Sequence, residues 1–309
     1  YETASACITA EHKTLLVTQR PGGSENVRRG FPHLVSVQND DNRKMKEMVA
    51  AAKGAGFFPA KAVWRLGILS DECSPGLYDS PTDGLKAYLV AAGVREWTEY
   101  RGACDLPSAQ RGGAEAVLRF NQDHVTHVLV AAGVGNVRAY LSAAGAAGYR
   151  PKHFTGDYLN MASGHLAKEL DPRSFDGAVG VTQTHAGEGV LGRPLPALAQ
   201  KCSKILTDHG LPPVRFDGAD DLGRHIEVLG LCESFLLFLQ VATAAGPDLT
   251  RSTWVGALPG VGNYRPAYSD LARFAPRGKM TGGDTSKLIQ WHANCTCWKE
   301  LTPFGPSVG

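Results

Sequence analysis

The residues best placed to do chemistry flank a helix-forming stretch in the middle of the chain. Gly133 and Gly135 directly follow an apolar run over residues 125–132, and Asp157 follows the next short apolar run. A glycine-rich turn between a strand and a helix, with an acid about 20 positions further on, is the pattern that binds a dinucleotide. Here Arg138 occupies the place of the third glycine, which close helix–strand packing requires. We therefore interpret Gly133 and Gly135 as a tight turn at the edge of a sheet where ligands bind.

Other catalytic signatures are missing from the sequence. It contains no HExxH, P-loop, GxSxG or paired-carboxylate motif. Asp40 and Asp41 are adjacent acids at a predicted helix start, where helix capping explains them. His292, Cys295 and Cys297 resemble soft metal ligands, but no second Cys/His pair lies nearby, so a local Cys295–Cys297 bridge or bridges to other residues fit better. We predict a protein that is not an enzyme and that has no metal or cofactor.

Composition and charge limit the class of protein. The 309 residues are 43% hydrophobic and carry a net charge of +2, without a basic stripe of the kind that binds nucleic acid. A membrane span needs about 18 uninterrupted apolar residues, and no stretch reaches this length. The longest candidate, residues 229–245, is interrupted by Glu233 and Gln240. The absence of an initial Met and of a signal peptide predicts a mature or truncated product. The length suits two α/β domains.

Seven cysteines, none in a CxxC motif, favour disulfide bonds and an extracytoplasmic location. Cys202 and Cys232 lie on consecutive predicted helices and face inward by helical periodicity, so we predict a bond between them. Cys73 and Cys104 each come just after a predicted strand and form the second predicted pair. The odd count leaves one thiol that is free or paired with a cysteine outside this chain.

Strands alternate with helices through most of the chain, which predicts right-handed βαβ crossovers and a doubly wound parallel sheet. Both strands around the central glycines then end at the same edge of that sheet. The predicted helices are residues 4–11, 43–53, 81–92, 107–121, 137–147, 162–169, 195–209, 220–245 and 252–258. The predicted strands are residues 15–18, 31–37, 65–69, 97–101, 125–132, 152–155, 178–182 and 287–292.

The two ends of this series predict how the chain divides into domains. Residues 1–39 are too few for a domain, and residues 185–288 contain helices but few strands. We expect 1–39 plus 185–288 to form lobe 1, and 40–184 plus 289–309 to form lobe 2. Several crossovers between two α/β lobes are what a hinged clamshell requires.

Seven segments in this order resemble the branched-chain-amino-acid type of substrate-binding protein of ABC transporters, which has the type I periplasmic-binding fold. Family members begin with βα units that precede the first segment matched here. The resemblance thus implies either missing N-terminal residues or a reduced first lobe, and the apolar surface that a reduced lobe would expose favours missing residues. The segments are TLLVTQRPGG at 14–23, GFPHLVSVQNDD at 30–41, LGILSDECSPG at 66–76, HVLVAAGVGNVRAYLSAAGAAGY at 127–149, FTGDYL at 154–159, FDGAVGVTQ at 175–183 and IQWHAN at 289–294.

The resemblance also implies a ligand site between the lobes. Amino-acid-binding members carry a carboxylate where Tyr158 stands here, with Asp157 one place early, and Pro75 replaces a tyrosine of the family. These departures argue against an α-amino acid as ligand, and Tyr78 and Tyr158 would suit stacking on a ring or sugar face. Arg20 would pair with a ligand carboxylate. The implied ligand-binding residues are Tyr1, Thr3, Arg20, Gly22, Asp71, Tyr78, Gly133, Gly135, Asp157 and Tyr158.

We therefore expect an extracytoplasmic receptor (secreted, lipid-anchored at the cell surface, or periplasmic). It would capture a small polar molecule, such as an amino acid, aromatic acid or sugar, for the membrane subunits of an ABC transporter. Two alternatives remain open on the same scaffold: an enzyme such as a lyase, cyclase or dehydrogenase, and the ectodomain of a signalling sensor. We expect no nucleic-acid partner.

Overall fold

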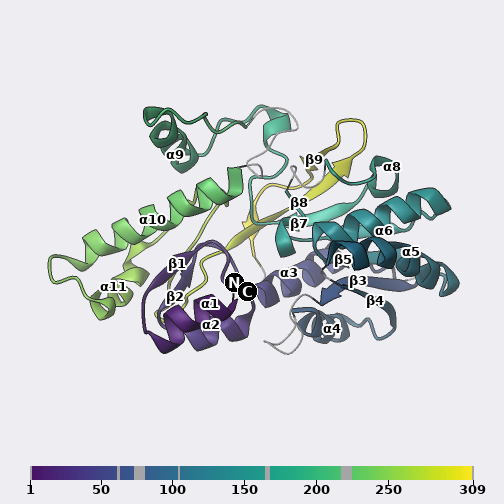
Figure 1. Ribbon diagram of the computed structural model, residues 1–309, viewed down its shortest axis with the longest axis horizontal. Helices are drawn as coiled ribbons and strands as arrows, with labels where there is room; N and C mark the ends of the chain where they lie inside the picture. Colours follow the sequence, from purple (N-terminus) through teal and green to yellow (C-terminus); the bar gives the residue numbers. More distant parts are fainter. Residues whose placement is uncertain are drawn as a thin grey trace.

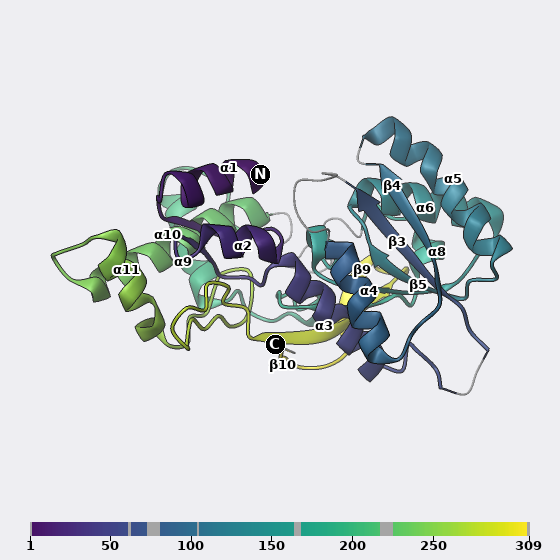
Figure 2. The same cartoon turned by 90° about the horizontal axis from the view of Figure 1, so that it is seen from below.

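The chain folds into two α/β lobes that lie side by side in the computed structural model (Figure 1). The structure describes residues 2–60, 63–72, 81–103, 105–163, 168–216 and 225–307. The larger lobe surrounds an eight-stranded sheet, and the smaller lobe contains a two-stranded sheet. Viewed from below, helix α3 (Asp41–Gly54) lies between the small-lobe helices and the large sheet (Figure 2).

The sheet of the large lobe is parallel through its first five strands in chain order, as the alternation of strands and helices predicts. The strand order is β10-β8-β7-β6-β5-β3-β4, with β9 pairing to β8. Strand β8 runs in the opposite direction, antiparallel to its three partners β7, β9 and β10. The strands are β3 (Leu66–Glu72), β4 (Trp97–Ala103), β5 (His127–Ala131), β6 (Lys152–Thr155), β7 (Val179–Thr182), β8 (Thr285–His292), β9 (Cys297–Glu300) and β10 (Gly305–Pro306).

Helices cover both faces of this sheet, which is why its central strand β5 is buried along its whole length. On one face, Phe120, Tyr140 and Phe175 belong to one core cluster. On the other face, Met48 and Leu85 belong to a second cluster. The helices are α3, α4 (Pro81–Ala92), α5 (Leu106–Gln122), α6 (Val134–Ala147), the short helix η2 (Tyr158–Asn160) and α8 (Pro172–Phe175). The doubly wound architecture is confirmed.

Local sequence signals explain where these helices begin and end. The Asp40 side chain accepts a hydrogen bond from the Arg43 backbone N–H at 3.0 Å, so Asp40 is the N-cap of α3. Gly148 ends α6 in the left-handed conformation, with φ of 68°, which glycine adopts without a steric penalty. Both signals are visible in the sequence.

The small lobe combines segments from both ends of the chain. Strands β1 (Leu16–Thr18) and β2 (Leu34–Ser36) pair in parallel, with Leu16 opposite Leu34. Val35, Leu237 and Trp254 belong to the core cluster of this lobe. Its helices are α1 (Glu2–Ala6), η1 (Cys7–Glu11), α2 (Ser24–Gly30), α9 (Ala197–Asp208), α10 (Ile226–Ala245), α11 (Arg251–Ala257) and η5 (Leu258–Val261). The short helix η3 (Gly189–Leu191) lies against β9 of the large sheet.

Helix α10 is the most apolar helix of the small lobe. By length and composition alone it is the one helix in the described ranges that could cross a membrane, with a mean hydropathy of 1.8 over its most apolar window. However, Leu229, Leu237 and Val241 are buried in the lobe, and Cys232 is bonded to Cys202 of α9. We therefore describe α10 as a core helix whose other face is exposed.

The predicted disulfide between Cys202 and Cys232 is confirmed, with an S–S distance of 2.04 Å. Cys295 and Cys297 are bonded to each other, so these two thiols are not metal ligands here. Cys7 is a free thiol. The predicted partners Cys73 and Cys104 lie outside the described residues.

Several predicted elements differ from the structure. Helix α2 was not expected, because Pro21, Gly22 and Gly23 were interpreted as the start of a loop rather than as the approach to a helix. The strand predicted over 31–37 shortens to Leu34–Ser36, since turns occupy residues 31–33. Of the helix predicted over 162–169, residues 164–167 lie outside the described part, and the described residues beside them are not helical.

Candidate functional site

Four neighbouring strands of the large sheet end at one edge, and the candidate site is built there. Asp71 lies near the end of β3, Gly133 follows β5, Tyr158 follows β6, and Gln183 follows β7. Ligands of open parallel sheets bind at the carboxyl ends of the strands.

Asp71 is the centre of this edge. Its Oδ2 accepts a hydrogen bond from the Gly133 N–H at 2.5 Å, and its Oδ1 accepts one from the Tyr158 hydroxyl at 3.4 Å. The residue is 5% exposed. Burial raises the pKa of this carboxyl, while hydrogen bonds from Gly133, Tyr158 and Asn136 oppose the increase. The structure thus brings together three predicted residues that are far apart in sequence.

Little space is left for a side chain at Gly133. A Cβ there would lie 3.2 Å from Asp71 Oδ2 and 3.1 Å from Leu159 Cδ1. Because Gly133 is the N-cap of α6, its N–H points from the positive end of the helix dipole, and Asp71 occupies that end. A ligand at this edge therefore meets the acceptor oxygens of Asp71 rather than a free anion site. Gly135 lies in the first turn of the same helix.

Leu159 next to this cluster has an unusual backbone. Its φ of 49° and ψ of 31° lie in the left-handed region, which costs a residue with a side chain about 1–2 kcal/mol. The side chain is nevertheless 42% exposed. Strained residues held in place by their surroundings concentrate at functional sites. The sequence FTGDYLN contains no signal that marks Leu159.

Asp157 points away from Asp71 although it precedes Tyr158. Its Oδ1 accepts from the Thr182 hydroxyl at 2.7 Å and its Oδ2 accepts from the Gln183 N–H at 2.6 Å. Burial raises the pKa of Asp157, and these two hydrogen bonds oppose the increase. Its carboxylate oxygens are therefore engaged by the end of β7, and Asp157 joins two strand ends of the large sheet.

The predicted site residues of the small lobe form contacts of their own. The Arg20 guanidinium forms an exposed ion pair with Glu227 of α10 at 2.5 Å. Gly22 has a φ of 77°, and its carbonyl accepts from the Asp41 N–H at 2.9 Å, which joins the loop after β1 to the start of α3. Thr3 lies in α1. Tyr1 and Tyr78 lie outside the described residues.

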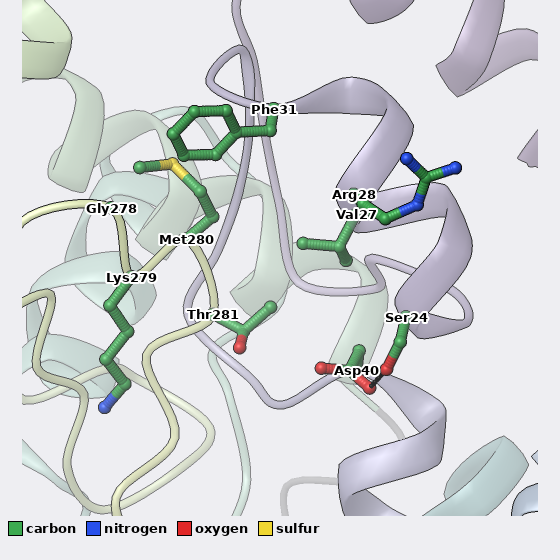
Figure 3. A pocket seen from close by; sticks show the side chains of 9 residues that line it. All are labelled: Ser24, Val27, Arg28, Phe31, Asp40, Gly278, Lys279, Met280 and Thr281. Atoms are coloured by element: carbon green, nitrogen blue, oxygen red, sulfur yellow. Dashed lines mark hydrogen bonds between the residues drawn. The ribbon is translucent and has the colours of Figure 1, made fainter.

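A separate open pocket of about 440 Å³ lies beside α2 in the small lobe (Figure 3). None of the predicted ligand-binding residues lines it. The Phe31 and Met280 side chains lie close together at one end, and the Ser24 hydroxyl donates to Asp40 at the other. Arg28 and Lys279 are paired with Glu25 and Asp284. The residues that line it are Ser24, Val27, Arg28, Phe31, Asp40, Gly278, Lys279, Met280 and Thr281. We regard this pocket as a gap between elements because both of its cations are paired with carboxylates and Asp40 caps α3.

Sequence reasoning missed three polar residues beside the predicted site. Asn136 donates from Nδ2 to the Ala103 carbonyl at 3.0 Å and lies next to Asp71. Gln183 and Glu47 are hydrogen-bonded to each other at 3.1 Å. Gln183 belongs to the matched segment FDGAVGVTQ, but only its contacts in the structure mark it as a candidate functional residue. In the described part of the chain, no three His, Cys, Asp or Glu side chains gather as metal ligands would.

The two lobes, the strand order and the sheet edge define the type I periplasmic-binding fold, the fold of ABC-transporter solute-binding proteins. No protein-family model and no curated protein matches this sequence. Three solved structures show the likeness. A branched-chain amino acid ABC transporter protein from Thermus thermophilus with bound valine has a TM-score of 0.73 and 12% identity. The match covers 99% of this chain and 76% of that one.

The other two structures are solute-binding proteins with other substrate classes in their names. A solute-binding protein from Rhodopseudomonas palustris HaA2 in complex with p-hydroxybenzoic acid has a TM-score of 0.71 and 13% identity, over 100% of this chain and 76% of that one. A fatty acid ABC transporter substrate-binding protein from Thermomonospora curvata has a TM-score of 0.62 and 15% identity, over 89% and 65%. At these identities the likeness establishes the fold, and it confirms the resemblance noted in the sequence.

Proposed function

We propose that this chain is an extracytoplasmic solute receptor that binds a small molecule between its lobes and presents it to the membrane subunits of an ABC transporter. The proposed lobes are residues 1–39 plus 185–288 and residues 40–184 plus 289–309, a division whose last boundary falls within β8. The observation that carries the proposal is the cluster of Asp71, Gly133 and Tyr158 at the carboxyl edge of the large sheet. No feature of the described residues specifically favours the alternatives of a signalling sensor or an enzyme.

The polarity of the site indicates the chemistry of the solute. Asp71 offers acceptor oxygens on the large lobe, which suits a hydroxyl or ammonium group of the solute. Arg20 on the small lobe is 46% exposed at its side chain and would exchange Glu227 for a solute carboxylate. Valine and p-hydroxybenzoic acid, bound by the two neighbours, each carry both kinds of group. We therefore propose a small carboxylic acid that also carries a hydrogen-bond donor.

Two disulfides support the proposed location. Cys202–Cys232 and Cys295–Cys297 are bonds that form and persist outside the cytoplasm. A solute that contacts both lobes only when they close shifts the balance between open and closed forms, which is the signal that a transporter would read.

The test is a thermal-shift screen with valine, p-hydroxybenzoate, octanoate and glucose as probes. A solute that binds the native state raises the unfolding midpoint with concentration. NMR spectra of the hit before and after incubation separate a receptor from an enzyme, since a receptor leaves the compound unchanged. No shift with any acid at millimolar concentration, or consumption of the hit, would contradict the proposal.

Variants locate the site once a probe binds. Asp71→Asn keeps the shape but removes the charge, and loss of a charge-assisted hydrogen bond weakens binding roughly tenfold or more. The matched control is Asp171→Asn, because Asp171 also caps a helix, α8, by accepting from the Ser174 N–H at 2.8 Å. Equal affinities for both variants would remove Asp71 from the site.

A further inference from the structure

Gln183 lies where the segments that join the two lobes meet. It directly follows β7 and is 2% exposed. Its side-chain Nε2 donates to Glu47 Oε2 of α3 at 3.1 Å, and its Oε1 accepts from the Asn39 N–H at 3.4 Å. Its backbone N–H donates to Asp157, and its carbonyl accepts from the Asp270 N–H at 3.1 Å. We name three crossovers: residues 37–40 between β2 and α3, residues 183–188 after β7, and residues 262–284 before β8. Gln183 belongs to the second crossover and contacts the first crossover, the middle of α3, the residue Asp157 after β6, and the third crossover.

The third crossover confines the same amide from another side. A Cβ at Gly283 would lie 2.5 Å from Gln183 Oε1, so a side chain there would displace the Gln183 amide. The end of β2 is also joined directly to the third crossover, since the Ser36 N–H donates to the Met280 carbonyl and the Gly282 N–H donates to the Ser36 carbonyl, both at 2.8 Å. The Gln183 amide therefore contacts both of the other crossovers.

The polar atoms around this amide are incompletely paired. In the described part of the chain, Asn39 Nδ2 and Oδ1 and Gln38 Nε2 are buried without a hydrogen-bond partner. Asn39 is fully buried, and Gln38 is 3% exposed. Buried polar groups without partners favour any rearrangement that returns them to water. These unpaired atoms therefore destabilise the observed arrangement of the crossovers, and the hydrogen bonds of Gln183 stabilise it.

We propose that Gln183 is a positioning residue for solute binding: its amide holds the three crossovers together and sets the balance between this arrangement and a more open one. This rests on the proposed receptor function, and Gln183 itself does not touch the solute. Its contribution reaches the site through Asp157, which directly precedes Tyr158 and accepts a hydrogen bond from the Gln183 backbone N–H. A receptor whose binding-competent arrangement is less populated binds more weakly by the same factor.

A pair of substitutions tests the amide specifically. Gln183→Glu keeps the size but replaces the amide that donates to Glu47 with a carboxylate, which then faces the Glu47 carboxyl. Adding Glu47→Gln reverses the direction of the hydrogen bond and restores a donor–acceptor pair. The matched control is Gln200→Glu, because the Gln200 amide donates to the Leu195 carbonyl at 2.7 Å on the exposed surface of α9.

Hydrogen–deuterium exchange and small-angle X-ray scattering measure the effect without any solute. In Gln183→Glu we expect roughly tenfold faster exchange over residues 36–44 and 181–188 and a larger radius of gyration. Exchange in β5 should stay unchanged. The double variant should return both readouts to those of the parent, and Gln200→Glu should not change them.

Three outcomes would overturn the proposal. Unchanged exchange at the crossovers in Gln183→Glu would mean that the Gln183 amide does not stabilise their arrangement. Acceleration that includes β5 to the same extent would indicate general destabilisation of the lobe. If Gln183→Glu does not fold, the double variant must fold and match the parent, and its failure to do so would also contradict the pairing. Since no solute is involved, these results are independent of whether a probe binds at Asp71.

Discussion

The buried carboxyl of Glu233 makes the sharpest prediction about stability. Glu233 lies on α10 and is fully buried, and its Oε2 accepts hydrogen bonds from the N–H groups of Ala267 at 2.8 Å and Tyr268 at 3.0 Å. Its Oε1 is buried and has no hydrogen-bond partner among the described residues. Burial raises the pKa of Glu233 from 4.5 to about 8, against these two hydrogen bonds. The folded protein therefore keeps this side chain protonated at neutral pH.

The sign of the pH dependence follows from proton counting. Between pH 4.5 and about 8 the folded state holds a proton on Glu233 that the unfolded state has released. The free energy of unfolding must then decrease by about 1.4 kcal/mol per pH unit over this interval. From pH 5 to pH 8 the loss is on the order of 4 kcal/mol. Glu233→Gln mimics the protonated form and does not titrate, so it should escape this loss.

Urea denaturation at pH 5, 6, 7 and 8 tests the reasoning. We expect the parent and Glu233→Gln to be similar in stability at pH 5 and the variant to gain progressively towards pH 8. Glu227→Gln is the control, because Glu227 lies on the same helix with a side chain that is 67% exposed. A stability difference between parent and Glu233→Gln that stays constant from pH 5 to pH 8 would refute it.

Two further predictions concern the small lobe. Replacing both Cys202 and Cys232 with Ala should lower the free energy of unfolding by about 3–4 kcal/mol, because their bond closes a loop across a sequence separation of 30. Equal stability of the oxidised parent and the double variant in urea denaturation would contradict this prediction. Leu237→Ala should cost about 2–5 kcal/mol because Leu237 is fully buried, whereas Leu231→Ala on the same helix should cost less than about 0.5 kcal/mol because Leu231 is 74% exposed. Similar losses in these two variants would show that the exposed face of α10 is covered in solution.

The order of strands and helices in the large lobe was predictable because each signal is local. Apolar runs such as residues 127–131 form buried strands, Asp40 caps α3, and Gly148 ends α6 in the left-handed conformation. The elements that were missed have weaker signals. Helix α2 begins after glycines that also suit a loop, and β9 and β10 are short and pair only with β8.

The candidate site was partly predictable for the same reason. Parallel strands bring their carboxyl ends to one edge, which is why Asp71 and Gly133 were expected together and are bonded to each other at 2.5 Å. The directions of Asp157 and Tyr158 were not predictable. The two residues are adjacent, yet Asp157 accepts hydrogen bonds from the end of β7 whereas Tyr158 donates one to Asp71 near the end of β3. Strand β6 lies between β5 and β7, so residues that follow it can turn to either side of the sheet edge.

Local patterns of apolar, capping and glycine residues were thus enough to establish the fold class, the sheet edge and the Cys202–Cys232 bond. Contacts between distant segments had no such pattern. Gln183 and Glu47 are separated by 136 residues, and nothing in either neighbourhood indicates that they meet. Only the packing of α3 against the crossovers brings them together, because a hydrogen bond between side chains depends on positions that the whole fold sets.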